Sequence, residues 1–396
     1  MGGKSELTVE ARSADAEVRS GMLPRPVLRV LMAAGGTGGH IFPALAIADE
    51  MRSRSKASAA GGSQFETLFL GTGRGLEARV IPAAGYPLET ITAAGLKGMR
   101  GWGRIANLAV LPRSGFEAAK ILRRFRPEVV VGMGGYISGP VMLEAALAGI
   151  PTLLFEPNAV PGFTNRALAP VVRMAAIGFQ KAAEVYGVKA RLTGHPVRRE
   201  FYQLASKIHA APYTVLIVGG SQGARALNQC QMQSLSLLRA NAPEVRFIHQ
   251  TGQADYNAVQ AAYDQQGIKA DVHAFIDNVP QAFAQADLVV CRAGATTVAE
   301  LAAAGKASIL IPYPSATDQH QLENARVLER AGGARLIEQS DLTPEKLVQE
   351  IRNVFGDPQA LAAMEQKVQT LARPDAAARI GDLIEELGAK RRTKSK

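Results

Sequence analysis

A histidine stands in the stretch of this chain that is best suited to chemistry. His40 directly follows the run Gly35-Gly-Thr-Gly-Gly39, and the apolar residues 30–34 precede that run. Such an apolar run is typical of a strand buried on both faces, and Pro43 suits the first turn of the helix expected to follow. Glycines let a ligand come close to the backbone, and free N–H groups at a helix N-terminus attract anions. An imidazole beside an anion site predicts acid–base chemistry.

A purely structural role is the alternative for this stretch. Many α/β domains begin with a strand, a glycine turn and a helix, and a histidine at a turn is often only a cap or a surface residue. Two familiar nucleotide signatures are excluded. Ile41 stands where a dinucleotide fingerprint needs glycine or alanine, and the Gly-x4-Gly-Lys-Ser/Thr phosphate loop does not occur in the chain.

Length and composition indicate a globular protein of two domains. The 396 residues are too many for one ordinary core, and 47% hydrophobic with 20% charged residues is typical of a folded, soluble chain. Cys230 and Cys291 offer neither a disulfide framework nor a metal spacing, so we expect a reducing cytoplasm, no metal and no cofactor. No apolar run is long enough to span a membrane, and residues 1–26 lack the core of a signal peptide.

The net charge of +10 leaves three classes of partner open: nucleic acid, an anionic membrane surface and phosphorylated substrates. Aromatic residues make up only 6% of the chain, and basic and aromatic residues do not alternate as they do on nucleic-acid platforms. We therefore expect no nucleic-acid partner, although charge alone does not choose between the other two classes.

The glycine corner is repeated twice more along an alternating pattern of strands and helices. The apolar run 129–131 leads into a second corner at 132–140, and the run 213–218 leads into a third at 219–223. This alternation predicts an α/β protein with parallel sheets. The third corner lies 184 residues after the first, which indicates two similar halves with a cleft between them. A basic helical region is expected at 105–125, interrupted at Pro112.

Four strings together closely resemble the MurG family: GGTGGHIFPA at 35–44, GMGGYISGP at 132–140, GGSQGAR at 219–225 and CRAGATTVAE at 291–300. The resemblance runs from about Val27 to about Leu387. It implies the GT-B fold, in which two Rossmann-like domains with parallel sheets face each other across a deep cleft. It also implies an inverting transferase that moves N-acetylglucosamine from UDP-GlcNAc to the 4-hydroxyl of the muramoyl sugar of lipid I, forming lipid II. The expected partners are therefore UDP-GlcNAc and lipid I.

The same resemblance divides the chain into parts. An acceptor- and membrane-binding domain at 27–196 is followed by a UDP-GlcNAc-binding domain at 197–373. Residues 1–26 precede the resemblance, and their mixture of both charges with Ser, Ala and Gly predicts a disordered extension. The last helix, at about 374–388, is expected to pack back on the first domain, and 389–396 is a basic tail most simply solvated.

The donor site implied by the resemblance uses the first and third glycine corners and the helix after Gly294. Arg198 and Ser221 would contact the diphosphate, as guanidinium and hydroxyl groups do well. Glu300 would accept the ribose hydroxyls, although Thr297-x-x-Glu300 also reads as a capping box. The expected UDP-GlcNAc contacts are Thr37, Gly38, Gly39, Asn158, Arg198, Ser221, Phe275 and Ile276 at the uracil, Ala295, Thr296, Thr297, Glu300, and His320 with Gln321 at the sugar.

On the acceptor side the resemblance implies His40, the two corner glycines Gly134 and Gly135, and Tyr136; Gly38, Gly39 and Asn158 belong to the same half. His40 is the candidate base for the acceptor hydroxyl, and Glu156 is the reserve. Since no Asp-x-Asp metal motif exists, helix N-termini and Arg198 would stabilise the departing UDP. Three positions depart from the family pattern, which usually has other residues at Phe155, Pro157 and His195.

A membrane-docking window is expected at 97–126, where eight Lys or Arg residues accompany a single acid, Glu117. A helix that is both basic and apolar can lie in the interface of an anionic membrane. We expect peripheral attachment to the cytoplasmic face, with 390–396 as a minor helper; the alternative is that the apolar residues face the core. Those apolar residues are Trp102, Ile105, Leu108, Leu111 and Phe116.

Two rival functions remain open. Enzymes resembling UDP-GlcNAc 2-epimerases share the two-domain fold and a uridine site, but have no obvious use for the glycine loop at 132–140. A nucleic-acid binder driven by charge would bind random duplex tightly and with strong salt dependence.

Overall fold

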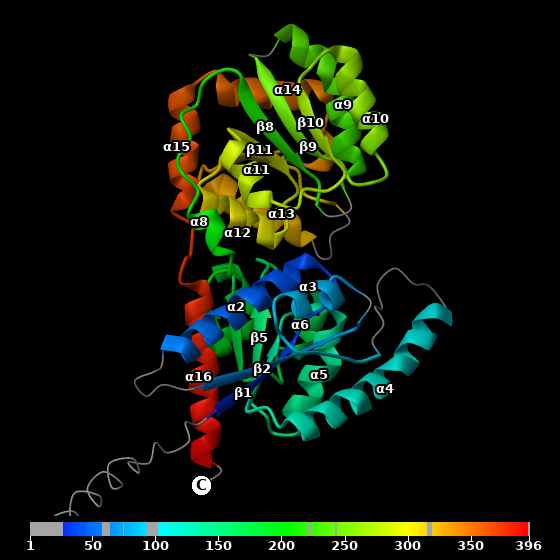
Figure 1. Ribbon diagram of the computed structural model, residues 1–396, viewed down its shortest axis with the longest axis vertical. Coiled ribbons are helices and arrows are strands. Elements are labelled where there is room, and N and C mark those ends of the chain that lie inside the picture. Colours follow the sequence, from blue (N-terminus) through cyan, green and yellow to red (C-terminus); the bar gives the residue numbers. More distant parts are fainter. Residues whose placement is uncertain are drawn as a thin grey trace, which may run out of the picture.

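Two parallel sheets form the frame of the molecule (Figure 1). The computed structural model describes residues 27–57, 64–73, 75–92, 102–220, 223–241, 244–314 and 319–394. For residues 102–111, 241 and 394 it describes the backbone alone. The expected extension at 1–26 and the donor residue Ser221 therefore lie outside the described residues.

The first domain is built on a seven-stranded parallel sheet with the order β3-β2-β1-β4-β5-β6-β7. Its strands are β1 Val27–Ala33, β2 Gln64–Gly71, β3 Leu88–Thr90, β4 Val129–Gly132, β5 Thr152–Glu156, β6 Met174–Ile177 and β7 Ala190–Leu192. The helices between them are α2 Gly38–Ala57, α3 Glu77–Ala83, α4 Trp102–Phe125, α5 Gly135–Leu147, α6 Phe163–Leu168 and α7 Ala183–Tyr186. The alternating strands and helices expected for this half are confirmed.

Apolar runs form these strands because both faces of the sheet are covered. Along β1, Val30 and Met32 join one core cluster, whereas Leu31 and Ala33 join the cluster on the opposite face. Successive side chains of a strand point to opposite faces, so a strand buried on both sides must be apolar throughout.

The second domain has a six-stranded parallel sheet with the order β10-β9-β8-β11-β12-β13. Its strands are β8 Tyr213–Val218, β9 Val245–Gln250, β10 Ala270–His273, β11 Leu288–Cys291, β12 Ser308–Leu310 and β13 Ala334–Leu336. Its helices are α9 Arg225–Asn241, α10 Tyr256–Gln266, α11 Val279–Gln285, α12 Ala295–Ala304, α13 His320–Arg330, α14 Pro344–Phe355 and α15 Pro358–Gln369, while the short helix α8 Arg199–Tyr202 lies on the connection between the domains.

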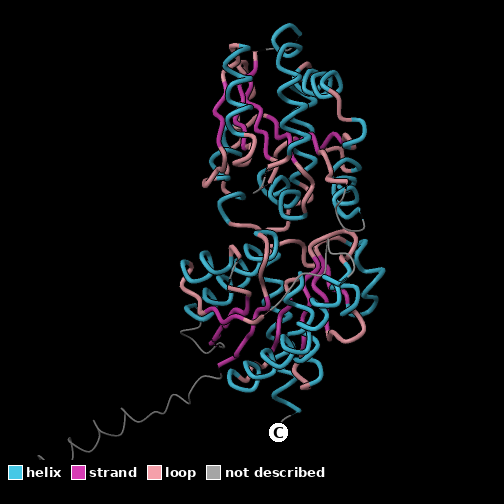
Figure 2. Tube along the Cα trace, turned by 90° about the vertical axis from the view of Figure 1, so that its right-hand side faces the viewer, coloured by secondary structure: helices cyan, strands magenta, loops and turns pink. Residues whose placement is uncertain are grey.

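The two domains are stacked along the long axis, as both views show (Figure 1, Figure 2). Helices α12 and α13 of the second domain face α2 and α3 of the first (Figure 1). This places the carboxyl ends of the central strands of both sheets towards the boundary between the domains, where ligands of open α/β sheets bind.

The last helix, α16 Ala376–Lys394, returns to the first domain and packs beside α2 (Figure 1). Ile380, Ile384 and Leu387 are buried in the core that contains β1. On α2, Arg54 donates hydrogen bonds to Asp382, Glu385 and the carbonyl of Ala378 at 2.7–3.0 Å.

The expectation of a solvated basic tail is wrong for its described residues, because the helix continues to Lys394. Arg392 forms an ion pair with Glu128 at 2.6 Å and donates to the carbonyl of Val27, and Arg391 donates to the carbonyl of Pro127. The tail is therefore held by partners on the first domain that are remote in the sequence.

Two expected helix boundaries are also wrong. Helix α2 begins at Gly38 rather than near Pro43, because the carbonyl of Thr37 accepts hydrogen bonds from the N–H groups of His40 and Ile41 and so closes the first turn earlier. Helix α4 is not interrupted at Pro112. Proline removes only one helical hydrogen bond, and the turns on either side hold this 24-residue helix together.

Candidate active site

Three helix N-termini, two from the first domain and one from the second, meet at the boundary between the domains. A Cβ atom placed on Gly134, just before α5, would lie 3.3 Å from Nε2 of His40 in the first turn of α2. A Cβ atom on Gly39 would lie 3.5 Å from the hydroxyl oxygen of Thr296 in the first turn of α12. Because each N-terminus carries unpaired N–H groups and a partial positive charge, their convergence favours an anionic ligand here.

The His40 imidazole lies against the second glycine corner. Its Nδ1 atom is buried and has no hydrogen-bond partner among the described residues. Burial lowers the pKa of His40, although the backbone of Gly35 opposes this effect. Gly134 and Gly135 have φ values of 93° and 75°, which favour glycine and leave no side chain between the backbone and the ring. His40 is therefore a neutral imidazole at neutral pH, ready to accept a proton.

Two of the three departures from the family pattern contact each other. The rings of Phe155 and His195 meet edge to face with centroids 5.4 Å apart. His195 is buried; Nδ1 lies 2.9 Å from the carbonyl oxygen of Pro196, and Nε2 lies 3.3 Å from Oγ1 of Thr296. Burial lowers the pKa of His195 to about 4, so the ring is neutral. Nδ1–H then donates to Pro196, and Nε2 accepts the hydroxyl proton of Thr296, which links the two domains.

Glu156, the reserve base, is completely buried at the end of β5. Its carboxylate accepts hydrogen bonds from the backbone and side chain of Asn158 at 2.9 and 3.2 Å and from Asn165 at 2.8 Å. Burial raises the pKa of Glu156 to about 7 against these hydrogen bonds. The carboxyl group therefore holds the loop that carries Asn158 and Asn165 rather than facing an open space.

On the second domain, Arg198 and Glu300 face each other. Nη2 of Arg198 lies 3.5 Å from Oε1 of Glu300, and the guanidinium lies between the rings of Phe42 and Phe201 at 5.3 and 5.0 Å from their centroids. Nε of Arg198 is buried without a partner in the described part of the chain. Burial raises the pKa of Glu300 to about 7, although Arg198 opposes the shift.

The capping-box interpretation of Thr297 and Glu300 is wrong. The N-cap of α12 is Gly294, so Thr297 is already a helical residue and no side chain caps this end. Because the Glu300 carboxylate does not cap the helix N-terminus, it is free to contact Arg198 and a ligand.

The remaining donor residues expected from the sequence are spread along the carboxyl edge of the second sheet. Ala295, Thr296 and Thr297 form the first turn of α12, and His320 and Gln321 begin α13. The side-chain oxygen of Gln321 accepts a hydrogen bond from the backbone N–H of Tyr313 at 3.0 Å.

Phe275 and Ile276 lie beyond β10, which ends at His273. Phe275 is half-exposed, and the backbone N–H of Ile276 donates to Oε1 of Gln250. The backbone N–H of Ile276 is therefore already engaged within the protein. On the acceptor side, Tyr136 is 37% exposed, beside Gly36.

Sequence reasoning missed Asn324, which joins the two halves of the site. Its side-chain oxygen accepts the backbone N–H of Ala159 at 2.9 Å, and its amide donates to Oδ1 of Asn158 and to the carbonyl of Ala293. The sequence could have indicated Asn324 through its position on α13, one helical turn after the expected site residue Gln321. An ion pair between Lys181 and Glu323, at 2.6 Å, also crosses the boundary.

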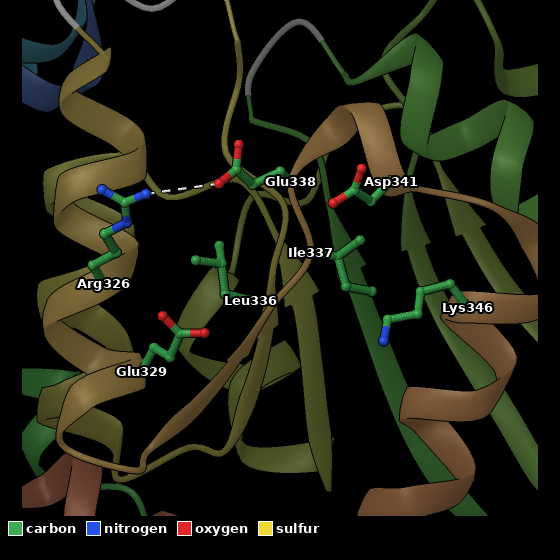
Figure 3. Close-up of a pocket in the computed structure, with 7 residues that line it drawn as sticks. All are labelled: Arg326, Glu329, Leu336, Ile337, Glu338, Asp341 and Lys346. Carbon is green, nitrogen blue, oxygen red and sulfur yellow. Dashed lines mark ion pairs between the residues drawn. The ribbon is translucent and has the colours of Figure 1, made fainter.

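A cavity of about 370 Å³ lies on the second domain (Figure 3), and Arg326, which lines it, forms an ion pair with Glu323 at 2.8 Å. Side chains of both charges line it, and Arg326 and Glu338 form an ion pair of 3.8 Å across its rim (Figure 3). None of the expected site residues lines this cavity. Among the residues that the structure describes, no three His, Cys, Asp or Glu side chains are grouped as metal ligands, and no helix is long and apolar enough to cross a membrane.

Comparisons with known proteins agree with the geometry. The model of the glycosyltransferase family 28 N-terminal domain matches residues 30–177, and that of the C-terminal domain matches residues 214–380. The chain is similar, at 45% identity over 364 residues, to the UDP-N-acetylglucosamine–N-acetylmuramyl-(pentapeptide) pyrophosphoryl-undecaprenol N-acetylglucosamine transferase of Myxococcus xanthus, with 91% of this chain and 93% of that protein covered. The equivalent transferase of Geobacter sulfurreducens is 43% identical over 361 residues, covering 90% and 97%.

Among solved structures, MurG of Acinetobacter baumannii is similar at a TM-score of 0.73 and 32% identity, and the match covers 91% of this chain and 99% of that one. A UDP-GlcNAc 2-epimerase from Neisseria meningitidis matches at a TM-score of 0.64 but only 11% identity, which shows a shared fold alone. The two-domain GT-B fold expected from the sequence is thus confirmed. The chain belongs to glycosyltransferase family 28 and, within that family, to the MurG transferases.

Proposed function

We propose that this protein transfers N-acetylglucosamine from UDP-GlcNAc to the 4-hydroxyl of the muramoyl sugar of lipid I and so forms lipid II in peptidoglycan biosynthesis. The observation that carries this proposal is a neutral imidazole, His40, at the meeting point of helix N-termini from both domains. The relatives named above carry out the transfer that their names describe, and they align over nine-tenths of the chain.

His40 acts as the base in a single displacement. It takes the proton of the acceptor hydroxyl while that oxygen attacks the anomeric carbon of the donor sugar from the face opposite UDP. The bond from the anomeric carbon to the diphosphate breaks, and its electron pair leaves with UDP. The N-terminus of α12 and Arg198 stabilise the negative charge that develops there, as preorganised donors do in other transferases.

We assign donor binding to the domain at 197–373. Arg198 and Ser221 hold the diphosphate, and Glu300 accepts the ribose hydroxyls once the 3.5 Å contact with Arg198 opens. Phe275 and the carbonyl of Ile276 border the uracil. Ala295, Thr296 and Thr297 present the helix N-terminus, and His320 and Gln321 contact the sugar, where Thr37 and Asn158 reach across from the first domain.

We assign acceptor binding to the domain at 27–196. The diphosphate of lipid I lies against the first two glycine corners, at Gly38–Gly39 and at Gly134–Gly135, beside Tyr136. Glu156 positions Asn158 and Asn165, and its burial leaves His40 as the base.

The decisive experiment separates transfer from its rivals. Purified protein with UDP-GlcNAc and lipid I in detergent should yield lipid II and UDP in equal amounts, whereas UDP-GlcNAc alone should yield no epimer and no rapid release of UDP. Appreciable epimer without acceptor would support the 2-epimerase alternative. Tight, salt-sensitive binding to random DNA duplex would support the nucleic-acid alternative.

We further propose that the protein attaches peripherally to the cytoplasmic face of the membrane through α4, which extends outwards from the first domain (Figure 1). Phe116 on α4 is 71% exposed, and Leu143 and Leu147 on the adjoining α5 are also exposed. The basic residues of the 97–126 window add attraction of about 1 kcal/mol each near an anionic surface. Because Arg391 and Arg392 are held against the first domain, we assign the attachment to α4 rather than to the tail.

Sedimentation with liposomes tests this attachment. Binding should require anionic lipid, weaken with added salt and fall when Trp102, Leu108 and Phe116 become serine. Ile208, which is 91% exposed near the second domain, provides the control, since Ile208→Ser removes an exposed apolar side chain elsewhere. Binding that ignores lipid charge and the α4 substitutions would remove this window as the docking surface.

A further inference from the structure

Behind the first glycine corner lies a buried carboxylate that the proposed reaction does not use. Glu77, the first residue of α3, is completely buried. Its Oε2 accepts the backbone N–H of Gly36 at 3.2 Å. Its Oε1 accepts the backbone N–H of Thr72 at 3.2 Å and the hydroxyl of Thr72 at 2.6 Å. One side chain therefore ties the corner that bears His40 to Thr72, just after β2.

Two glycines leave the space that this side chain fills. A Cβ atom on Gly71 would lie 2.9 Å from Cγ of Glu77, whereas one on Gly35 would first meet Cδ1 of Ile137 at 2.3 Å. A Cβ atom on Gly75 would overlap Oε2. Gly71 and Gly75 thus make room for Glu77.

The carboxylate is ionised in the folded protein. Burial alone would raise the pKa of Glu77, but the hydrogen bonds from Thr72 and Gly36 outweigh burial and hold the pKa below its usual range. A negative charge behind an anion-binding corner opposes the anion. The charge nevertheless has a structural use. Its hydrogen bond to the backbone of Gly36, whose φ is +94°, fixes the turn that leads into α2.

We propose that Glu77 is a positioning residue for the acceptor: it fixes Gly36 so that the N–H groups of residues 37–40 and the ring of His40 face the acceptor. This inference rests on the proposed placement of the acceptor diphosphate at the first corner. Thr37 is the one donor contact assigned among these residues, and the other domain supplies the diphosphate, ribose and uracil contacts. Loss of Glu77 should therefore weaken use of the acceptor far more than affinity for the donor.

Glu77→Gln is the first test. The amide keeps one oxygen but turns an NH2 group towards N–H donors, so kcat/KM for lipid I should fall by about tenfold to a hundredfold, the range for loss of a charge-assisted hydrogen bond. The dissociation constant of UDP-GlcNAc should stay within about twofold.

Glu128→Gln is the matched control. Glu128 lies in the same domain and also accepts a backbone hydrogen bond, from the N–H of Arg29. It precedes β4, at the edge of the sheet where the strands begin, and there it pairs with Arg392. The site lies at the opposite edge, where the strands end. This variant should lower the melting temperature without changing the kinetics of either substrate.

Gly75→Ala tests the same contact from the other side. The new Cβ displaces the flexible carboxylate without straining the backbone, so acceptor kinetics should suffer as in Glu77→Gln. Combining the two changes should add little to either one alone, because both remove one interaction. Gly162→Ala is the control, since nothing lies within 4 Å of its Cβ position and its φ is −67°.

The outcomes are distinct. Unchanged acceptor kinetics in folded Glu77→Gln or Gly75→Ala, or an equal loss of donor affinity, would overturn the positioning role. Tyr136→Ala checks the underlying placement: if it leaves the KM for lipid I unchanged, the proposed acceptor site is wrong. If Tyr136→Ala raises that KM and the Glu77 and Gly75 variants do not, the inference about Glu77 alone fails. Should Glu77→Gln not fold, Gly75→Ala carries the test.

Discussion

The two sides of the site start from the same local structure and differ in the side chains they present. In each domain a buried parallel strand runs into a glycine turn and a helix N-terminus. The first domain places His40 there, whereas the second places Arg198 opposite Glu300. The backbone thus offers affinity for an anion on both sides, and the side chains differ, with an imidazole on one side and an arginine–carboxylate pair on the other.

Burial favours the uncharged form of a titratable group on both sides of the site. It lowers the pKa of His40 and raises the pKa of Glu300 to about 7. Desolvation disfavours the charged form of either group. In the free protein the proposed base His40 is therefore neutral, and the carboxyl group of Glu300 is close to half-ionised at neutral pH.

The largest effect should come from removing the imidazole. His40→Ala should lower kcat by about a hundredfold or more, since a general base acts mainly in the transition state. The KM for UDP-GlcNAc should change little, because the donor is bound chiefly by the other side. Steady-state kinetics with both substrates checks this. A nearly unchanged kcat would leave His40 as a structural residue of the turn and remove the contrast between the two sides.

Glu300→Ala should show the opposite pattern. Affinity for UDP-GlcNAc should fall by about tenfold to a hundredfold, as expected when a charged acceptor of hydrogen bonds is lost. Calorimetric titration with UDP-GlcNAc measures this, and a thermal melt provides the control. Because Glu300 does not cap α12, the melting temperature should not fall in proportion. A destabilised protein with intact donor affinity would contradict the assignment.

The pH dependence of donor binding should sharpen the contrast further. The ribose hydroxyls bind the carboxylate form of Glu300, so affinity should fall as pH drops through the pKa of about 7. The loss from pH 8 to pH 6 is at most about tenfold. UDP-GlcNAc is the suitable probe, since its diphosphate does not titrate in this range. Glu300→Gln should give a nearly flat profile; an unchanged slope in that variant would assign the titration to another group.

The same shift has a consequence for stability. A carboxyl whose pKa is raised on folding contributes stability that is complete below its unfolded pKa and is lost as pH rises towards 7. Relative to Glu300→Gln, the unliganded protein should therefore lose stability between about pH 4.5 and pH 7.

The smallest effect is expected at the ion pair that joins the two sides. Lys181 is 44% exposed, so Lys181→Met should change kcat/KM and the free energy of unfolding by less than about 1 kcal/mol. Any difference from the wild type should disappear at high salt. A larger, salt-resistant loss would mean that the pair with Glu323 holds the two sides in register.

The sequence alone determined the features that depend on neighbouring residues. Apolar runs followed by glycines predicted the strand–turn–helix corners, because burial on both faces and close backbone approach impose those residue types locally. The restart of that pattern predicted the two halves. Local pattern failed at helix ends: the carbonyl of Thr37, rather than Pro43, set the start of α2.

Only the tertiary structure decided which remote groups meet. Glu77 bonds Gly36 across 41 residues, His195 meets Thr296 across 101, and Arg392 reaches Glu128 across 264. No periodicity records such pairs, because the sheet order and the return of α16 bring them together. The sequence placed an imidazole after a run of glycines and a carboxylate in the helix that follows Gly294. The fold buried Nδ1 of His40, with no partner in the described part of the chain, and set Glu300 against Arg198.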